Sequence, residues 1–225
     1  MLQKSTLQFL KNIKSNNHKD WMDAHRADYE SAKKDFAKLV DEVIVAFGKK
    51  DVEIAHLAPS ACIFRFNRDI RFSKDKSPYK TNFAASLNKN GKKAHNAEYY
   101  LHLEPGKSFC GGGIWMPEAK ELSAIRQEID YNWEEFQTII NHKNFTKTFG
   151  TLDFSPEYTL TREPKGYEKD NPAIDYLKLK SFITLHEIPD AVFFSETVVK
   201  EIVATFSALQ PLIVFLNRAV EDCSQ

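Results

Sequence analysis

The chain has 225 residues, with 31 basic and 31 acidic side chains, so it carries no net charge at pH 7. This balance argues against a protein that coats nucleic acid through bulk positive charge. Hydrophobic residues make up 42% of the chain and charged residues 28%, which is enough apolar material for a sizeable core. The composition therefore excludes the disordered and fibrous classes and predicts a folded globular protein.

The cysteines and the apolar runs indicate in which cellular compartment we expect the protein. Cys62, Cys110 and Cys223 are odd in number and form no CxxC pair, which argues against a disulfide framework or a thiolate zinc site. Residues 1–14 lack an apolar stretch followed by a cleavage site, and apolar runs such as Pro211–Leu216 are too short to span a bilayer. We therefore expect a cytoplasmic protein without a membrane span.

The first third of the chain predicts two helices and a strand. Apolar residues at three-residue steps indicate a short helix over Thr6–Ile13, followed by a polar loop at Ser15–Asn17. From Trp21 to Phe47 apolar residues recur at three- and four-residue steps, which indicates one long helix ending before Gly48. Ala61–Asn67 changes to alternating, β-branched and aromatic residues, which predicts a strand.

The middle of the chain predicts an antiparallel hairpin. Two alternating segments, Glu98–Leu103 and Ser108–Trp115, flank the turn sequence Glu104–Lys107. The triplet Gly111–Gly113 interrupts the second strand without the spacing of a phosphate-binding loop, so a bulge or a close approach of neighbouring backbone is favoured.

One face of this hairpin carries polar side chains. Alternation places Tyr100, His102 and Glu104 together. The His and Glu form a candidate acid–base pair or two metal ligands. A solvated or hydrogen-bonded face is the favoured alternative, because no third ligand at zinc-site spacing accompanies them. We expect no metal site.

The second half of the chain predicts further helices around a long connection. Pro117 marks a helix that ends near Tyr131, and Asn132 with Glu135 forms a capping pattern for the next helix. Thr151–Pro172 is rich in Pro, Gly, Glu and Lys and keeps no period, so it is either a surface excursion or part of a site.

The C-terminal part predicts a strand and a closing helix. Leu177–Leu185 is expected to be the strand, with Lys178 and Lys180 on one face. Ser195 is expected to cap the helix, and Pro211 to kink or restart it. Together these elements predict a single α+β domain over residues 1–225, with a mostly antiparallel sheet flanked by several helices.

Positive charge is concentrated between Ala61 and Asn82. This segment has six basic and two acidic residues, a local net charge of +4, so the rest of the neutral chain carries −4. Alternation puts Arg65 in the predicted strand, where its head needs a partner or a water-filled cleft near the sheet. Apolar side chains between the charges are expected to anchor this cationic loop to the core: Phe66, Ile70, Phe72 and Tyr79.

A second polar segment, Pro164–Pro172, follows later in the chain. Its Lys165, Tyr167 and Asp170 offer donors and acceptors that could face the cationic loop across a cleft. A plain surface loop is the alternative.

Several segments together resemble one family. Spread in order over nearly the whole chain, they are FLKNIKSNNHKDW, RDIRFSKDKSPYKTNF, YYLHLEPG, GGGIW, PKGYEKDNPAIDYLKLKSF and PLIVFLN. The chain is therefore identified as similar to the bacterial and fungal family called domain of unknown function 2461, with RDxRFSxDKxPYK as its most specific segment. The resemblance implies a single α+β domain of about this size and brings no activity.

Two functions are compatible with these residues. The first is binding, with or without turnover, of a small molecule that bears phosphate or carboxylate. The second is a non-enzymatic module that docks an acidic protein or a nucleic-acid backbone. Alternatively, Asp69 and Asp75 pair with the arginines and the motif is purely structural. The sequence shows no coenzyme fingerprint and leaves the oligomeric state open. The expected ligand-binding residues are Arg65, Arg68, Asp69, Arg71, Ser73, Asp75, Lys76, Tyr79, Lys80, Lys165, Tyr167 and Asp170.

Overall fold

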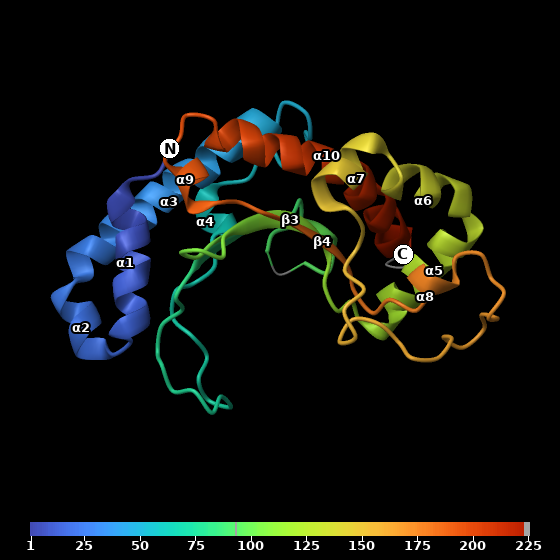
Figure 1. Ribbon diagram of the computed structural model, residues 1–225, viewed down its shortest axis with the longest axis horizontal. Coiled ribbons are helices and arrows are strands. Elements are labelled where there is room, and N and C mark those ends of the chain that lie inside the picture. Colours follow the sequence, from blue (N-terminus) through green and yellow to red (C-terminus); the bar gives the residue numbers. More distant parts are fainter. Residues whose placement is uncertain (93, 223–225) are drawn as a thin grey trace. The chain divides into compact units, whose positions relative to one another are not determined.

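The computed structural model, which describes residues 1–92 and 94–222, contains one antiparallel sheet with the strand order β1-β2-β3-β4 (Figure 1). The strands are β1 (Phe83–Leu87), β2 (Glu98–Leu103), β3 (Phe109–Ile114) and β4 (Phe182–Glu187). The helices within the described residues are α1 (Lys4–Ser15), α2 (Lys19–Ala24), α3 (Arg26–Phe47), α4 (Pro59–Cys62), α5 (Ala119–Tyr131), α6 (Trp133–Ile140), α7 (Lys143–Phe149), α8 (Ile174–Leu177), α9 (Asp190–Phe193) and α10 (Val198–Asp222). The α+β class is confirmed.

The chain forms two compact units that alternate along the sequence, each built from three segments. The first unit comprises Met1–Lys92, Tyr100–Cys110 and Glu187–Ala204. The second comprises Lys93–Tyr99, Gly111–His186 and Thr205–Gln225. Strands β2, β3 and β4 and helix α10 contribute residues to both units.

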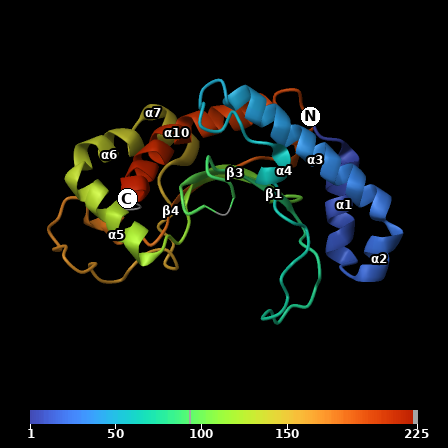
Figure 2. The ribbon, with the colours of Figure 1, turned by 180° about the vertical axis from the view of Figure 1, so that it is seen from behind.

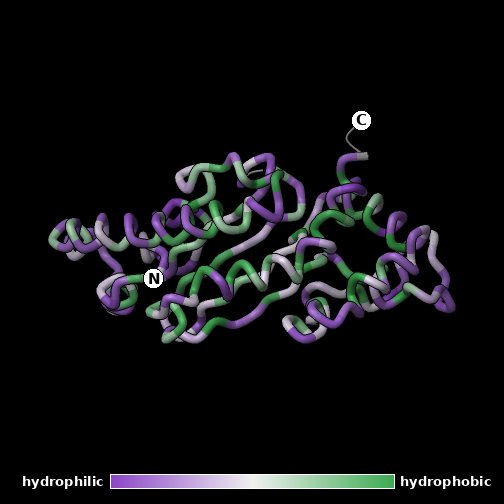
Figure 3. The backbone as a smooth tube through the Cα atoms, turned by 90° about the horizontal axis from the view of Figure 1, so that it is seen from above, coloured by the Kyte–Doolittle hydropathy of each residue, from purple (hydrophilic) through white to green (hydrophobic). Residues whose placement is uncertain are grey.

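Helices α1 and α3 lie side by side in the first unit (Figures 1 and 2). Leu10, Ile13 and Phe36 are fully buried, and the Thr6 hydroxyl donates a 2.5 Å hydrogen bond to the Asp35 carboxylate of α3. Hydrophobic and hydrophilic residues alternate along the helices in Figure 3, as expected of helices that bury one face. The short N-terminal helix is confirmed.

The predicted helix from Trp21 to Phe47 is interrupted, because α2 ends at Ala24 and α3 starts at Arg26. His25 at the junction has φ −113° and ψ 26°, outside the helical region, and its Nδ1 lies 2.8 Å from the Trp21 carbonyl oxygen. The three- and four-residue spacing of apolar residues continues across the junction, so the hydrophobic pattern does not reveal the break between α2 and α3.

The predicted strand at Ala61–Asn67 is wrong. Its first residues belong to α4, with Pro59 in the first helical turn, where proline is favoured. The remainder forms only isolated bridges, from Ile63 to Ala85 and from Asn67 to Tyr79. The strand in this part of the chain is β1, which was missed because all five of its side chains are buried and show no alternation.

The hairpin of β2 and β3 is confirmed. The Lys107 amide donates to the Glu104 carbonyl across the turn at 2.9 Å, and Gly106 has the left-handed φ of +73° that glycine favours. On β2, Leu101 and Leu103 are fully buried, as alternation predicted.

The glycine triplet of β3 is explained by close backbone approach. A Cβ at Gly111 would lie 2.1 Å from the Thr184 carbonyl oxygen of β4. At Gly112 it would lie 2.0 Å from that of Glu98 in β2, and at Gly113 1.9 Å from that of Phe182. A side chain at any of these positions would force the neighbouring backbone to move.

The two helices predicted after the hairpin are present, and the first of them starts two residues later than expected. Helix α5 begins at Ala119, capped reciprocally by Glu118 and Glu121, and not at Pro117. Helix α6 starts at Trp133 directly after Asn132, as predicted, but the Asn132 side chain makes no capping hydrogen bond, and its amide nitrogen donates to Glu128 at 3.0 Å. Glu135, the other half of the predicted capping pair, accepts hydrogen bonds from Arg218. Helices α7 and α9 were not predicted.

The predicted strand at Leu177–Leu185 begins too early. Leu177 ends α8 and β4 starts only at Phe182, because the Arg126 guanidinium holds the carbonyls of Leu177 and Leu179 at 2.7 and 3.1 Å. Lys178 and Lys180 therefore precede the strand, and Lys178 lies 3.5 Å from Glu163.

The closing helix α10 runs from Val198 through Pro211 without interruption, and Ser195 lies before its first turn, where its hydroxyl accepts from the Thr197 amide. By length and composition Val198–Glu221 could cross a membrane, and half of its most apolar window is buried in this structure. Cys62 and Cys110 are buried, whereas Cys223 lies outside the described residues.

Candidate functional site

The site is built on the long loop between α4 and β1, which we call the cationic loop (63–82). Its two arms pair near its base, where the Arg68 amide donates to the Pro78 carbonyl and the Lys80 amide donates to the Phe66 carbonyl, each at 2.9 Å. Beyond this pairing the loop extends away from the sheet (Figures 1 and 2). It therefore has a braced base and a projecting tip.

Aromatic packing anchors the base. Phe66 is 5% exposed, and its ring centroid lies 5.1 Å from that of Phe83 in β1 and 5.2 Å from that of Tyr29 in α3. This part of the predicted anchoring is confirmed. Phe72 at the tip is 95% exposed and anchors nothing within the described structure, which corrects the prediction for that residue.

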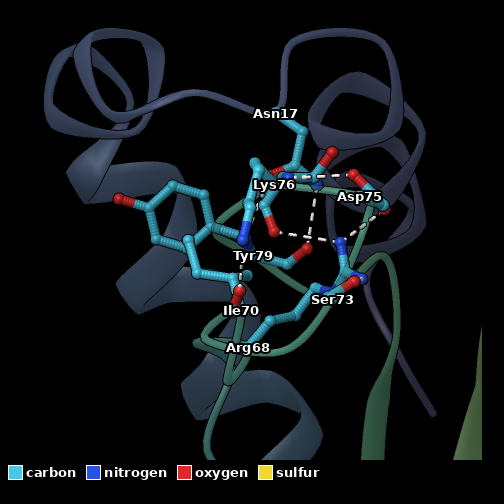
Figure 4. Close-up of polar contacts among 8 residues, drawn as sticks. Asn17, Arg68, Ile70, Ser73, Asp75, Lys76 and Tyr79 are labelled. Atoms are coloured by element: carbon cyan, nitrogen blue, oxygen red, sulfur yellow. Dashed lines mark hydrogen bonds and ion pairs between the residues drawn. The ribbon is translucent and has the colours of Figure 1, made fainter.

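A side chain from the polar loop after α1 clamps the base from outside. The Asn17 amide nitrogen donates to the Tyr79 carbonyl at 2.9 Å, and its oxygen accepts from the Tyr79 amide at 3.0 Å (Figure 4). A side-chain amide thus satisfies both polar groups of one backbone residue, as a neighbouring strand would. Asn17 and Tyr79 are 62 residues apart in the chain.

Arg68 ties the two arms together. Its guanidinium donates to the Asp75 carboxylate at 2.5 Å, to the Ser77 carbonyl at 3.0 Å and, at 3.4 Å, to the Ser73 hydroxyl (Figure 4). The backbone amide of Ser77, its hydroxyl and the Arg68 guanidinium all donate to Asp75, and they lower the pKa of that carboxyl to about 2. Asp75 therefore stays ionised throughout the neutral range.

The other arginines lie at the surface of the loop. Arg71 grips Asp69 with two side-chain hydrogen bonds of 2.9 and 2.6 Å, which lower the pKa of the Asp69 carboxyl. Arg65 is 71% exposed and its guanidinium lies 4.0 Å from Asp69. The prediction that Arg65 belongs to a strand is wrong, and Asp69 is the partner of its head. Lys76 caps the Ile70 carbonyl at 3.0 Å.

Beside the base lies a pocket of about 340 Å³. It brings together four of the predicted ligand residues, Arg68, Asp75, Tyr79 and Lys80. The other predicted residues of the cationic loop, Arg65, Asp69, Arg71, Ser73 and Lys76, are not among those that line it. Sequence reasoning missed the remaining lining residues, which are Lys14, Asn17, Ser77, Thr81 and Asn82.

Lys80 and Lys14 supply the pocket with cations that have little competition from carboxylates. The Lys80 ammonium lies 5.3 Å from the centre of the Phe64 ring, and its pKa is lowered by burial and then by the nearby charge of Arg65. Lys14 at the end of α1 lies 3.9 Å from Glu104, which is too long for a tight ion pair. Both ammonium groups are suited to an anion that enters the pocket.

His102 of β2 and Glu104, which follows the strand, border the pocket through Asn82 and Lys14. The Asn82 amide nitrogen is 3.4 Å from His102 Nδ1, and His102 Nε2 is 3.4 Å from Glu104. Burial lowers the pKa of His102, and the hydrogen bond to Glu104 opposes that effect. The hydrogen bond between His102 and Glu104 agrees with the favoured alternative of a hydrogen-bonded face.

The second predicted segment belongs to the second unit. Lys165 and Asp170 are exposed there, and Tyr167 is half-buried. Burial and the charge of Asp130 raise the pKa of the Tyr167 phenol. The expectation that these three residues face the cationic loop stays a prediction. Within the described ranges, no three His, Cys, Asp or Glu side chains gather as a metal site would require.

A family model described as conserved hypothetical protein (DUF2461) matches residues 5–215. The chain therefore belongs to this family, as the resemblance of its motifs indicated. No curated protein and no solved structure matches the chain. The family description assigns no activity, so the proposal below is based on the pocket.

Proposed function

We propose that the first unit binds a small phosphate- or carboxylate-bearing molecule in the pocket beside the cationic loop. The observation that carries the proposal is the convergence of Lys14, Arg68 and Lys80 from separate parts of the chain on one pocket of about 340 Å³. Asp75 is the one carboxylate among its lining residues, and it is already engaged by Arg68 and Ser77. The lining therefore carries an excess of positive charge.

Preorganisation supports this proposal. Arg68 is held in place by Asp75 and Ser77, and the base of the loop is braced by Phe66 and Asn17. Donors that are already fixed lose little conformational entropy when an anion arrives. A charge-assisted hydrogen bond contributes about 1.5–3 kcal/mol, so two or three of them hold a small anion at micromolar to millimolar concentrations.

The volume limits the ligand. Pockets for small molecules span about 300–1,000 Å³, so this pocket is near the lower end and suits a group the size of a sugar phosphate or a small dicarboxylate. Asn82 and Thr81 add neutral hydrogen-bonding side chains to the same lining, which would orient such a ligand.

A thermal-shift panel of inorganic phosphate, sugar phosphates, nucleotides and dicarboxylates at two salt concentrations tests the proposal. A ligand at a hundred times its dissociation constant stabilises by about 2.7 kcal/mol, so we expect a rise of several degrees in midpoint. The rise should persist at the higher salt, because the partly buried pocket is less screened than a surface. No shift with any anion would contradict it.

The exposed tip favours a second candidate, a module that docks an acidic macromolecule. Phe72 is 95% exposed, and the Arg71 guanidinium lies 5.8 Å from the centre of its ring. Exposed aromatic and Arg side chains are typical of interface anchors.

Fluorescence anisotropy with a polyglutamate peptide and a single-stranded oligonucleotide tests this candidate. Binding lost in Phe72→Ser would support it, and nucleic-acid binding should weaken steeply with salt.

A further inference from the structure

A row of aromatic rings continues from the pocket over the sheet of the first unit. Tyr100 and His102 stand on β2, Phe109 on β3 and Phe64 on the cationic loop. The His102 and Phe109 rings stack at 4.6 Å with planes 6° apart. The Tyr100 ring lies 5.8 Å from Phe109 and 6.2 Å from Phe64. We call these four residues the aromatic row.

The aromatic row lies on the half-exposed face of β2. Its four members are all intermediate in exposure, whereas Tyr99, Leu101 and Leu103, which alternate with them, are 1% exposed or less. Cross-strand aromatic pairs stabilise a sheet, but the exposed parts of these stacked and tilted rings also present a polarisable aromatic surface. Such a surface is what aromatic ligands stack on.

Two residues connect the aromatic row to the pocket. Lys80 lines the pocket, and its ammonium lies 5.3 Å from the centre of the Phe64 ring. Asn82 also lines the pocket, and its side-chain amide lies 3.4 Å from His102 Nδ1. A ligand with its anionic group among Lys14, Arg68 and Lys80 would therefore direct the rest of its structure over the rings.

We propose that the ligand is a nucleoside monophosphate whose base stacks on the aromatic row while its phosphate occupies the pocket. This inference rests on the proposed function, because the pocket supplies the phosphate site. The pocket volume of about 340 Å³ accommodates the phosphate and sugar better than an entire nucleotide, so the base requires a surface outside it. The aromatic row is that surface, and Asn82 connects it to the pocket through His102.

Isothermal titration calorimetry with AMP, ribose 5-phosphate and inorganic phosphate tests the inference. Stacking of one base on aromatic side chains makes AMP bind at least tenfold tighter than ribose 5-phosphate, a difference of about 1.4 kcal/mol. Phe109→Leu or Tyr100→Leu should remove most of this advantage and leave the affinity for ribose 5-phosphate unchanged. Lys80→Met should weaken both ligands.

Tyr131→Leu is the matched control, because Tyr131 is 74% exposed on α5 of the second unit and should change neither affinity. Thermal melting establishes that each variant is folded. Two separate substitutions in the aromatic row keep the test valid if one of the variants does not fold. Equal affinities for AMP and ribose 5-phosphate would overturn the inference and leave the phosphate pocket standing. Failure of all three ligands to bind would overturn both the inference and the phosphate form of the proposed function.

Discussion

The base and the tip of the cationic loop have similar compositions and different environments. At the base, Arg68 is 27% exposed and bonded to both a carboxylate and a carbonyl, while Phe66 is 5% exposed. At the tip, Arg71 is 75% exposed and Phe72 is 95% exposed. The comparison teaches that a dense basic motif need not act as one site. Burial and the position of each carboxylate decide which cations can serve a ligand.

The largest expected difference between base and tip is in stability. Phe66→Ala removes a ring that packs against Phe83 and Tyr29, so we expect it to lower the free energy of unfolding by about 3–5 kcal/mol. Phe72→Ala should change it by less than about 0.5 kcal/mol. Urea denaturation of both variants measures the two values. Equal losses would mean that the tip is packed in solution.

The hydrogen bonds of Asn17 at the base should contribute less to the free energy of unfolding than the Phe66 ring does. Asn17→Ala leaves the Tyr79 amide and carbonyl without their side-chain partners, and we expect a loss of about 1–3 kcal/mol, the worth of two partly buried hydrogen bonds. Asn12→Ala, an exposed position inside α1, is the control and should change stability by under about 0.5 kcal/mol. If the two variants melt alike, Asn17 does not brace the loop.

The smallest expected effect concerns pH and His102. Burial lowers the pKa of His102 below 6.5 in the folded state, so the folded state binds fewer protons than the unfolded one. His102 therefore costs no stability above pH 6.5, and it destabilises progressively as the pH falls from 6.5 through its folded pKa. His102→Gln should lose less stability than the parent chain between pH 7 and pH 5. An equal change in melting temperature between pH 7 and pH 5 for His102→Gln and the parent chain would contradict this.

The elements with a clear local signal were predictable. β2 and β3 were placed because alternation and the Pro-Gly turn agree, and α1 because its apolar steps end at a polar cluster. β1 was missed because a fully buried strand shows no period. The sequence predicted a strand where α8 ends. The cause of the turn is a pair of hydrogen bonds from the Arg126 side chain, which is distant in sequence and leaves no local signal.

The candidate site was only half predictable. Charge density located Arg68, Asp75, Tyr79 and Lys80, because they share one segment. Lys14 and Asn17 carry no local signal for this pocket, since the α1 end meets the loop only through tertiary folding, with Asn17 and Tyr79 62 residues apart. Local charge also could not separate the pocket cations Arg68 and Lys80 from Arg71, which does not line the pocket.

The most direct test of the central claim is a calorimetric titration of inorganic phosphate into the parent chain, Lys80→Met and Arg71→Met. Both substitutions remove one cation from the same loop, but only Lys80 lines the pocket. If the pocket binds the anion, Lys80→Met should weaken phosphate binding about tenfold or more, the equivalent of one charge-assisted hydrogen bond, and Arg71→Met should change it less than twofold. Equal weakening by both variants would show that the anion is attracted by the loop as a whole and would contradict the pocket.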